Sequence, residues 1–116
     1  MRHVYQVAGL EPCETDFVEA HGTGTQAGDH IETAALAKVF CHSRSPTRPL
    51  RVGSIKTNVG HLEGTSGVGG VIKAVLMLEN RTFLPNRNFR LVNPRIRCKD
   101  WHLKVRILNA FIWYSY

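Results

Sequence analysis

Hydrophobic and polar positions in the first part of the chain change from the two-residue period of a strand to the longer period of a helix. Residues 16–20 alternate weakly and are rich in β-formers, which predicts a strand that ends at the glycines of residues 21–25. Apolar residues then recur every three or four positions, which predicts a helix over residues 30–40. Asp29 stands at the expected N-cap and Glu32 follows three residues later, a spacing typical of a capping box.

The same succession of elements occurs a second time, after a proline-containing loop at residues 43–49. Residues 50–55 predict a strand, residues 56–61 a polar turn, and residues 62–79 a helix. The first half of this helix is rich in glycine, and each glycine costs about 1 kcal/mol relative to alanine. Either another backbone packs closely there, or the segment becomes helical only after Gly70. The predicted apolar face of the helix comprises Val68, Ile72, Val75 and Leu76.

The order strand, helix, strand, helix predicts an α/β fold with parallel strands joined by a right-handed crossover. In such sheets, ligands bind beyond the carboxyl ends of the strands. Each predicted strand is followed by a polar loop, so His21, Lys56 and His61 are predicted to meet at one rim of the sheet. From Leu84 onward the chain shows neither period, which predicts an extended segment.

Composition limits the partners that the chain can have. Hydrophobic residues make up 43% and charged residues 21%, as in a folded domain. The net charge of +6 comes largely from arginines spread between Arg81 and Arg106, and no nucleic-acid-binding motif accompanies them. We therefore expect a solvated basic surface, which also suits docking of an acidic carrier protein. The longest apolar stretch, residues 68–78, is interrupted by Lys73 and is too short to cross a membrane.

The three cysteines, Cys13, Cys41 and Cys98, have spacings that match neither a disulfide framework nor a zinc site. The sequence contains no pattern typical of a signal peptide, so a cytoplasmic location is expected. Cys13 stands between two glutamates, Glu11 and Glu14, which disfavour a reactive thiolate. All three cysteines are interpreted as ordinary thiols.

Dinucleotide, P-loop and HExxH motifs are absent, and two polar signatures remain. Residues 21–32 contain HGTGT, then GD and a glutamate, and residues 53–64 read GSIKTNVGHLEG. Together they resemble the two late signatures of β-ketoacyl synthases (ketosynthases), most closely those of large multidomain polyketide synthases. The resemblance extends over about residues 5–105. It predicts that residues 1–105 are the C-terminal part of a ketosynthase domain and that residues 106–116 are a divergent apolar tail.

The resemblance implies a thiolase-like layered α/β fold, of which this chain is one part, and a homodimeric parent enzyme. It also implies decarboxylative Claisen condensation of acyl and malonyl thioesters in polyketide or fatty-acid biosynthesis. His21 and His61 match the two histidines that would donate hydrogen bonds to the thioester oxygen and stabilise the enolate. Lys56 matches a lysine that organises the site electrostatically and is expected to pair with Glu32.

The same resemblance implies that substrates arrive on the phosphopantetheine arm of an acyl carrier protein, while this segment binds no cofactor. Thr23 and Thr25 match hydroxyls that hydrogen-bond the arm, with bonding to the local loop backbone as the alternative for each. Asp29 is expected to be structural, as a helix cap. The implied partners are the carrier, the N-terminal ketosynthase half and a second copy, but neither nucleic acid nor a membrane.

The chain departs from the family at two points. His30 replaces the proline that usually follows Gly-Asp, which predicts a slightly looser helix start. The nucleophilic cysteine of the family, set in an elbow of small residues, has no counterpart here. We therefore expect the isolated chain to be inactive in condensation. The alternative hypothesis is a non-catalytic interaction fragment that complements a separate, nucleophile-bearing chain.

Overall fold

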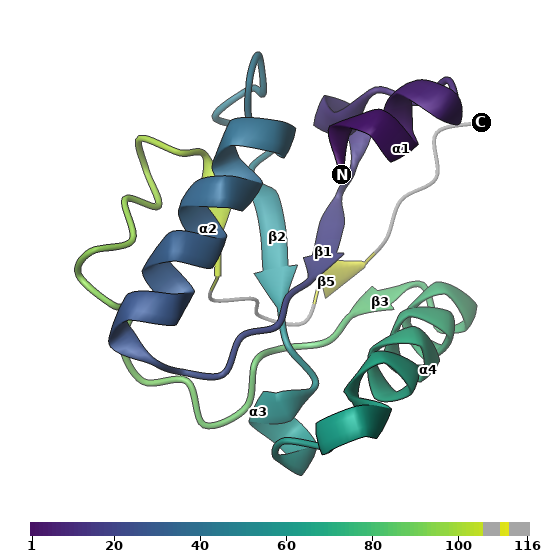
Figure 1. Ribbon diagram of the computed structural model, residues 1–116, viewed down its shortest axis with the longest axis vertical. Helices are drawn as coiled ribbons and strands as arrows, with labels where there is room; N and C mark the ends of the chain where they lie inside the picture. The colour runs from purple at the N-terminus through teal and green to yellow at the C-terminus, as the bar shows by residue number, and fades with distance from the viewer. Residues whose placement is uncertain (106–109, 112–116) are drawn as a thin grey trace.

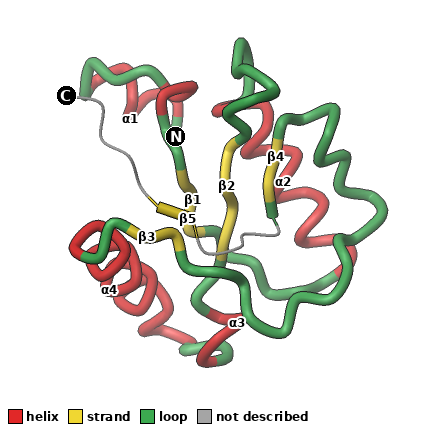
Figure 2. The backbone as a smooth tube through the Cα atoms, turned by 180° about the vertical axis from the view of Figure 1, so that it is seen from behind, coloured by secondary structure: helices red, strands yellow, loops and turns green. Residues whose placement is uncertain are grey.

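The centre of the fold is a parallel sheet of three short strands (Figure 1). The computed structural model describes residues 1–105 and the backbone of residues 110–111. The strands are β1 (Phe17–Glu19), β2 (Leu50–Gly53) and β4 (Leu103–Lys104), in the spatial order β1-β2-β4. The view from behind shows β2 between the other two (Figure 2). Because β1 and β2 pair in parallel and a helix connects them, the predicted α/β class is confirmed.

Two long helices, α2 (Gln26–Phe40) and α4 (Ser66–Glu79), accompany the sheet. A small antiparallel ladder pairs β3 (Thr82–Phe83) with β5 (Ala110–Phe111). The short helical turns are α1 (Arg2–Val7), η1 (Pro12–Glu14), α3 (Lys56–Val59) and η2 (Glu63–Thr65). Over the described residues, each helix is too short or too polar to cross a membrane.

The two long helices pack on opposite faces of β1. On one face, buried residues of α2 and β2 form the larger hydrophobic cluster, against which Val18 packs. On the other face, Met77 of α4 and Phe83 of β3 form a smaller cluster with Phe17. Since neighbouring strand residues point to opposite sides of a sheet, Phe17 and Val18 direct the two helices to different faces. The ends of β1 and β2 therefore lie between two helical layers.

The first long helix begins at Gln26, earlier than the sequence predicts. Thr25 is its N-cap, and the Thr25 hydroxyl accepts a hydrogen bond from the Gly28 N–H at 3.2 Å. The prediction that Asp29 is the N-cap is wrong, because Asp29 lies inside α2. Its carboxylate instead accepts a hydrogen bond from the Gly24 N–H at 3.1 Å, which ties the preceding loop to the helix.

Side-chain contacts, rather than a late helix start or a close approach of another backbone, account for two glycines of α4, so the prediction of a closely packed backbone is wrong there. The helix begins at Ser66, so the alternative that it becomes helical only after Gly70 is wrong. A Cβ atom on Gly69 would lie 2.8 Å from a methyl carbon of Leu62, and one on Gly70 would lie 3.2 Å from Cγ of Glu19. A larger residue at either position would push neighbouring side chains aside.

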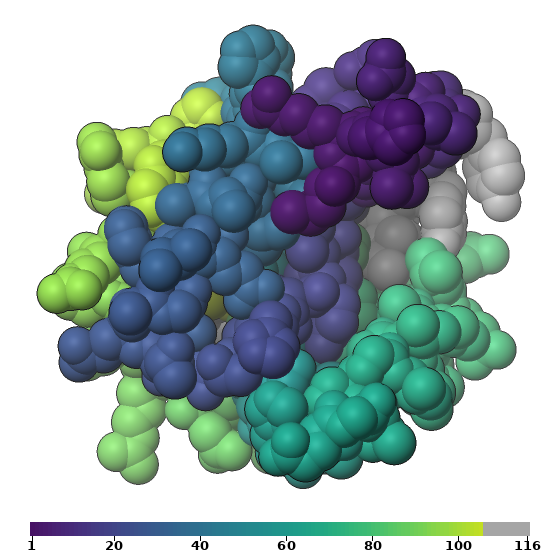
Figure 3. All heavy atoms as spheres, in the orientation of Figure 1, coloured from purple at the N-terminus to yellow at the C-terminus, as the bar shows by residue number. Residues whose placement is uncertain are grey.

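The apolar face that periodicity predicts as buried in α4 is instead exposed in this chain. Ile72 is 54% exposed, whereas Met77 is 3% exposed. The residues that pack toward the sheet are Gly70, Lys73 and Met77. The helix is apolar on more than one side, so the period alone selects the wrong side. Figure 3 shows α4 on the surface in green. We call the exposed residues Val68, Val71, Ile72, Val75 and Leu76 the α4 stripe.

Candidate active site

The first polar loop, residues 21–25, is held in place by side chains of α2. The Glu32 carboxylate accepts hydrogen bonds from the N–H groups of His21 at 2.7 Å and Gly22 at 2.9 Å. Gly22 has a φ of +48°, and a Cβ atom there would lie 2.7 Å from Cβ of Ser54. Glycine is therefore required where the two polar loops meet.

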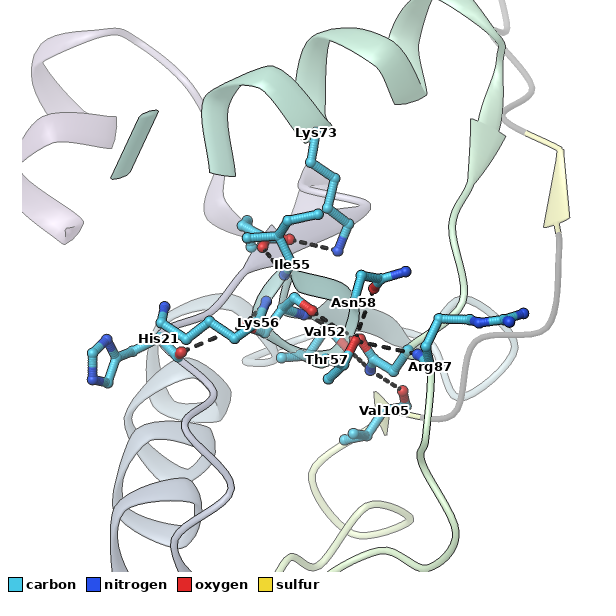
Figure 4. A network of polar contacts seen from close by, with 12 residues as sticks. His21, Val52, Ile55, Lys56, Thr57, Asn58, Lys73, Arg87 and Val105 are labelled. Carbon is cyan, nitrogen blue, oxygen red and sulfur yellow. Dashed lines mark hydrogen bonds and ion pairs between the residues drawn. The ribbon is translucent and has the colours of Figure 1, made fainter. Parts of the chain in front are cut away.

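The second polar loop begins at Ser54 and is fixed by Asn86. Asn86 Oδ1 accepts a hydrogen bond from the Ser54 N–H at 3.1 Å, and Asn86 Nδ2 donates to the carbonyl groups of Val52 and Val105 at 3.2 and 2.8 Å. The Ser54 hydroxyl donates to the His21 carbonyl at 3.4 Å, which joins the two loops (Figure 4). The partners of Asn86 lie far along the chain, so no local sequence pattern identifies it as a site residue.

The two candidate histidines come together at the carboxyl end of the sheet, as the sequence predicts. The ring centroids of His21 and His61 are 5.7 Å apart, and the ring planes meet at 81°. His61 Nδ1 accepts a hydrogen bond from the Glu63 N–H at 3.0 Å. A neutral His61 ring that accepts at Nδ1 carries its hydrogen on Nε2. The ring therefore presents an N–H donor on the side away from Glu63.

Lys56 shares this rim but lacks its predicted partner. Lys56, His21 and Glu19 line one open hollow of about 410 Å³ between the sheet and α4. Between the described residues, no ion pair joins Lys56 to Glu32. Both Glu32 oxygens instead accept from backbone N–H groups of the first loop. The glycine-rich loop leaves those donors without secondary-structure partners, and Glu32 supplies the acceptors that they require.

The two candidate threonines differ in their contacts. The Thr25 hydroxyl accepts a hydrogen bond from the Gly28 N–H, as a helix cap does. This is the local bonding to backbone that the sequence leaves open as the alternative for Thr25. Thr23 is exposed on the same loop. Binding of a phosphopantetheine arm stays a prediction for both residues.

His30, the residue that replaces proline, has partners far along the chain. Its Nδ1 lies 3.0 Å from the Arg95 carbonyl, and its ring lies 5.7 Å from the Trp101 ring. These contacts attach the start of α2 to the segment before β4. The looser helix start that the sequence predicts is untested.

The cysteines lie away from the histidine pair. Cys41 and Cys98 pack against the larger hydrophobic cluster, and Cys13 lines a separate hollow with Tyr5. Burial raises the pKa of the Cys41 thiol, an effect that Arg44 partly offsets, and burial also raises the pKa of Cys98. A raised pKa keeps a thiol protonated and weakly nucleophilic, which agrees with ordinary thiols. The described part of the chain also contains no metal-binding cluster of His, Cys, Asp and Glu.

A family sequence pattern and individual known proteins both show the family to which this chain belongs. The sequence pattern of the family described as "Beta-ketoacyl synthase, C-terminal domain" matches residues 1–90. Highly reducing polyketide synthase phiA from a fungal species is 63% identical over 107 residues, which cover 92% of this chain. Highly reducing polyketide synthase tstA from Talaromyces stipitatus is 59% identical over 105 residues, or 90% of this chain. The chain spans 4% of the length of each of these curated relatives.

Solved ketosynthase structures share the fold. Ketosynthase twelve of the bacillaene polyketide synthase from Bacillus amyloliquefaciens superposes with a TM-score of 0.88 at 32% identity, covering 99% of this chain and 20% of that protein. The ketosynthase from module 6 of the Bacillus subtilis bacillaene synthase gives a TM-score of 0.87 at 33% identity, covering 98% of this chain and 21% of that protein. The predicted thiolase-like fold, present in part, is therefore confirmed. The domain boundary at residue 105 stays a prediction, and residues 106–109 and 112–116 of the predicted tail lie outside the described residues.

Proposed function

Because this chain belongs to the family of β-ketoacyl synthase C-terminal domains, we propose that it supplies the two-histidine half of a ketosynthase active site in a polyketide synthase. The observation that carries the proposal is the approach of His21 and His61, from two loops far apart in the sequence, to a centroid distance of 5.7 Å. Lys56 lines the hollow beside His21 and adds a positive charge to it.

The proposed reaction is a decarboxylative condensation. The bond between the α-carbon and the carboxylate of a malonyl thioester breaks, carbon dioxide leaves, and the electron pair moves into the thioester as an enolate. The α-carbon of the enolate then attacks an acyl thioester carried on a cysteine, and the cysteine thiolate leaves. That cysteine is proposed to belong to ketosynthase sequence outside this chain. None of Cys13, Cys41 and Cys98 lines the hollow beside His21.

The residues of this chain would act on the enolate oxygen. Imidazole N–H groups that are already oriented stabilise a developing negative charge without reorganisation in the reaction step. The Glu63 N–H orients His61 in this way, and the Glu32 carboxylate fixes the backbone from which His21 projects. Two neutral histidines would thus form the donor pair, with Lys56 as a nearby cation that favours the anionic thioester.

The proposal includes the partners implied by the family. Substrates would arrive on the phosphopantetheine arm of an acyl carrier protein or domain, with Thr23 and Thr25 as candidate contacts for the arm. The net charge of +6 supports attraction of an acidic carrier. We also propose a homodimeric, cytoplasmic parent enzyme, and no cofactor bound by this segment itself.

The proposal is tested in a grafted domain, defined as the ketosynthase domain of phiA in which residues 1–105 of this chain replace the matching segment. At 63% identity, most packing contacts with the rest of that domain are expected to survive the exchange. We expect the grafted domain to release carbon dioxide from a malonyl thioester and to form a β-ketoacyl product. Product formation is measured by mass spectrometry of the carrier-bound acyl chain.

The matched control is the same grafted domain with the nucleophilic cysteine of phiA replaced by alanine, which should form no β-ketoacyl product. The isolated 116-residue chain should also form none. A correctly folded grafted domain that releases no carbon dioxide would contradict the proposal. So would acylation of a cysteine of the isolated chain at a catalytic rate.

The α4 stripe is also compatible with a second candidate function, a fragment that complements a separate chain. An exposed row of apolar side chains on one helix is typical of a surface that another protein covers. The proposed occupant is the remainder of a ketosynthase domain, since the solved ketosynthases are about five times longer than the segment that this chain matches. Condensation restored by mixing two separate chains would favour this form over a continuous domain.

We expect Ile72→Glu to abolish co-purification of this chain with the phiA ketosynthase domain that lacks the matching segment. A charge in the α4 stripe would have to be buried without a partner, which is strongly unfavourable. The matched control is Leu91→Glu, because Leu91 is also apolar and is 88% exposed outside the stripe. Equal binding by both variants would show that the stripe is not the contact surface.

A further inference from the structure

An ion pair between buried Lys73 and half-buried Glu19 lies at the hollow that His21 and Lys56 line, and Glu19 also lines this hollow. Nζ of Lys73, on α4, donates a hydrogen bond to the Glu19 carboxylate at 2.8 Å. The side chain of Lys73 is 1% exposed and that of Glu19 is 18% exposed. Figure 4 shows Lys73 directed from α4 toward the start of the second polar loop at Ile55. The proposed chemical steps use neither member of this pair.

The same carboxylate also holds the second polar loop. The other oxygen of Glu19 accepts a hydrogen bond from the N–H of Ile55, the residue immediately before Lys56. Glu19 ends β1, two residues before His21. One carboxylate therefore joins the strand that leads to the first loop, the backbone that leads to the second, and helix α4.

The surrounding residues leave room for this pair. A Cβ atom on Gly53 would lie 3.0 Å from the Phe17 ring and 3.1 Å from Nζ of Lys73. A Cβ atom on Gly70 would lie 3.2 Å from Cγ of Glu19. Nζ of Lys73 also lies 5.2 Å from the centroid of the Phe17 ring, within the range of a cation–π contact. The pair thus occupies a slot that two glycines keep open.

We propose that Glu19 and Lys73 are positioning residues that hold the two histidine-bearing loops in register for decarboxylation. This inference rests on the proposed function. Lys73 orients the Glu19 carboxylate, and Glu19 then fixes the Ile55 N–H relative to the end of β1. Loss of either side chain lets the second loop shift against the first. After such a shift, His21 and His61 would no longer act together on one oxygen. A misplacement of about 1 Å can cost on the order of 100-fold in rate.

The test compares Glu19→Gln and Lys73→Met in the grafted domain. Each is expected to lower kcat for malonyl decarboxylation by about 10- to 100-fold, with KM within about threefold, because donor geometry changes and binding of the arm does not. Acylation of the phiA cysteine is expected to keep its rate, since the proposed role of the histidines is on the malonyl thioester. The matched controls, Glu79→Gln and Lys38→Met, change exposed helical residues and should change neither step.

A double variant separates positioning from stability. Glu19→Met combined with Lys73→Met leaves no unpaired buried charge. The melting temperature of this double variant should therefore fall less, relative to the unsubstituted domain, than the melting temperature of the single variant Lys73→Met. The Ile55 N–H still has no acceptor, so decarboxylation should stay slow. Hydrogen exchange of a peptide covering residues 54–61 should be faster in this double variant than in the two controls, and this readout requires no activity.

The outcomes distinguish this inference from the proposed function. If the unsubstituted grafted domain is active and the variants decarboxylate at control rates, the positioning role is overturned and the proposed function stands. If acylation and decarboxylation fall together, or if the double variant regains full activity, the pair is structural and the inference is wrong. If the unsubstituted grafted domain is inactive, the proposed function fails. Faster exchange of residues 54–61 in the variants would then still support loop positioning, and unchanged exchange would overturn it.

Discussion

Replacing His61 with alanine in the grafted domain is expected to lower the rate of malonyl decarboxylation about 100- to 1,000-fold. The substitution removes the donor that the Glu63 N–H holds in its Nε2–H form. His21→Ala should have an effect of similar size, and the double variant should lose less than the product of the two single effects, because residues that act as a unit are non-additive. Carbon dioxide release in single turnover measures the step directly.

The matched control for both variants is His3→Ala, which removes an exposed histidine from α1. It should leave the rate unchanged. Acylation of the phiA cysteine serves as an internal control, since we expect it to stay within a few-fold in both histidine variants. Full decarboxylation by a folded His61→Ala domain would show that the imidazole pair does not stabilise the enolate.

The meeting of His21 and His61 could be predicted from the sequence because it depends on topology alone. Two strands that each end in a polar loop, and that pair in parallel, place those loops at one edge of the sheet. The register of β1 with β2 pairs Glu19 with Gly53, so both loops leave the sheet at the same level. The period-two and helical patterns predict β1, β2, α2 and α4. They miss β4, the third strand of the sheet, which lies in the segment predicted only as extended.

The partners of buried charges could not be predicted in the same way. Lys73 falls within an apolar run, where periodicity describes it only as an interruption, yet it is the most buried charged residue that the structure describes. Its partner, Glu19, lies on another element, and no local spacing connects the two. For Glu32, a partner is predicted from the sequence but is not the one that the structure shows. The family signature assigns it a lysine partner, whereas the unpaired N–H groups of a glycine-rich loop determine its contacts in this chain.

The exposed side of α4 has a related cause. A helix that is apolar on two sides is typical of an element buried between two layers. This chain supplies one layer, through Phe17 of β1 and Phe83 of β3, which pack with Met77 of α4, and leaves the α4 stripe uncovered. The apolar pattern of α4 is therefore that of a helix covered on both sides, although this chain covers only one of them. The mismatch between the predicted and observed buried sides supports the proposal that further ketosynthase sequence packs against α4.

Arg44→Met is expected to lower the free energy of unfolding by about 3–5 kcal/mol. The Arg44 guanidinium is buried, with the residue 5% exposed, and it donates to backbone carbonyl groups rather than to a carboxylate. Its acceptors are Phe40 at 3.2 Å, Arg48 at 3.1 Å, and Thr15. Methionine would fill much of the space but would leave these carbonyl groups without donors. Each unsatisfied buried group costs about 1–3 kcal/mol, and partial access to water keeps the total below the sum.

The measurement is the urea midpoint of the grafted domain at unchanged m-value. The matched control is Arg97→Met, because Arg97 forms an exposed ion pair with Asp100 at 2.8 Å and its side chain is 66% exposed. That pair should contribute less than about 1 kcal/mol, so the control should unfold close to the unsubstituted domain. Arg44 joins the end of α2 to the segments that enter β1 and β2. A small effect of Arg44→Met would therefore mean that packing of α2 alone fixes the two strands that carry the site.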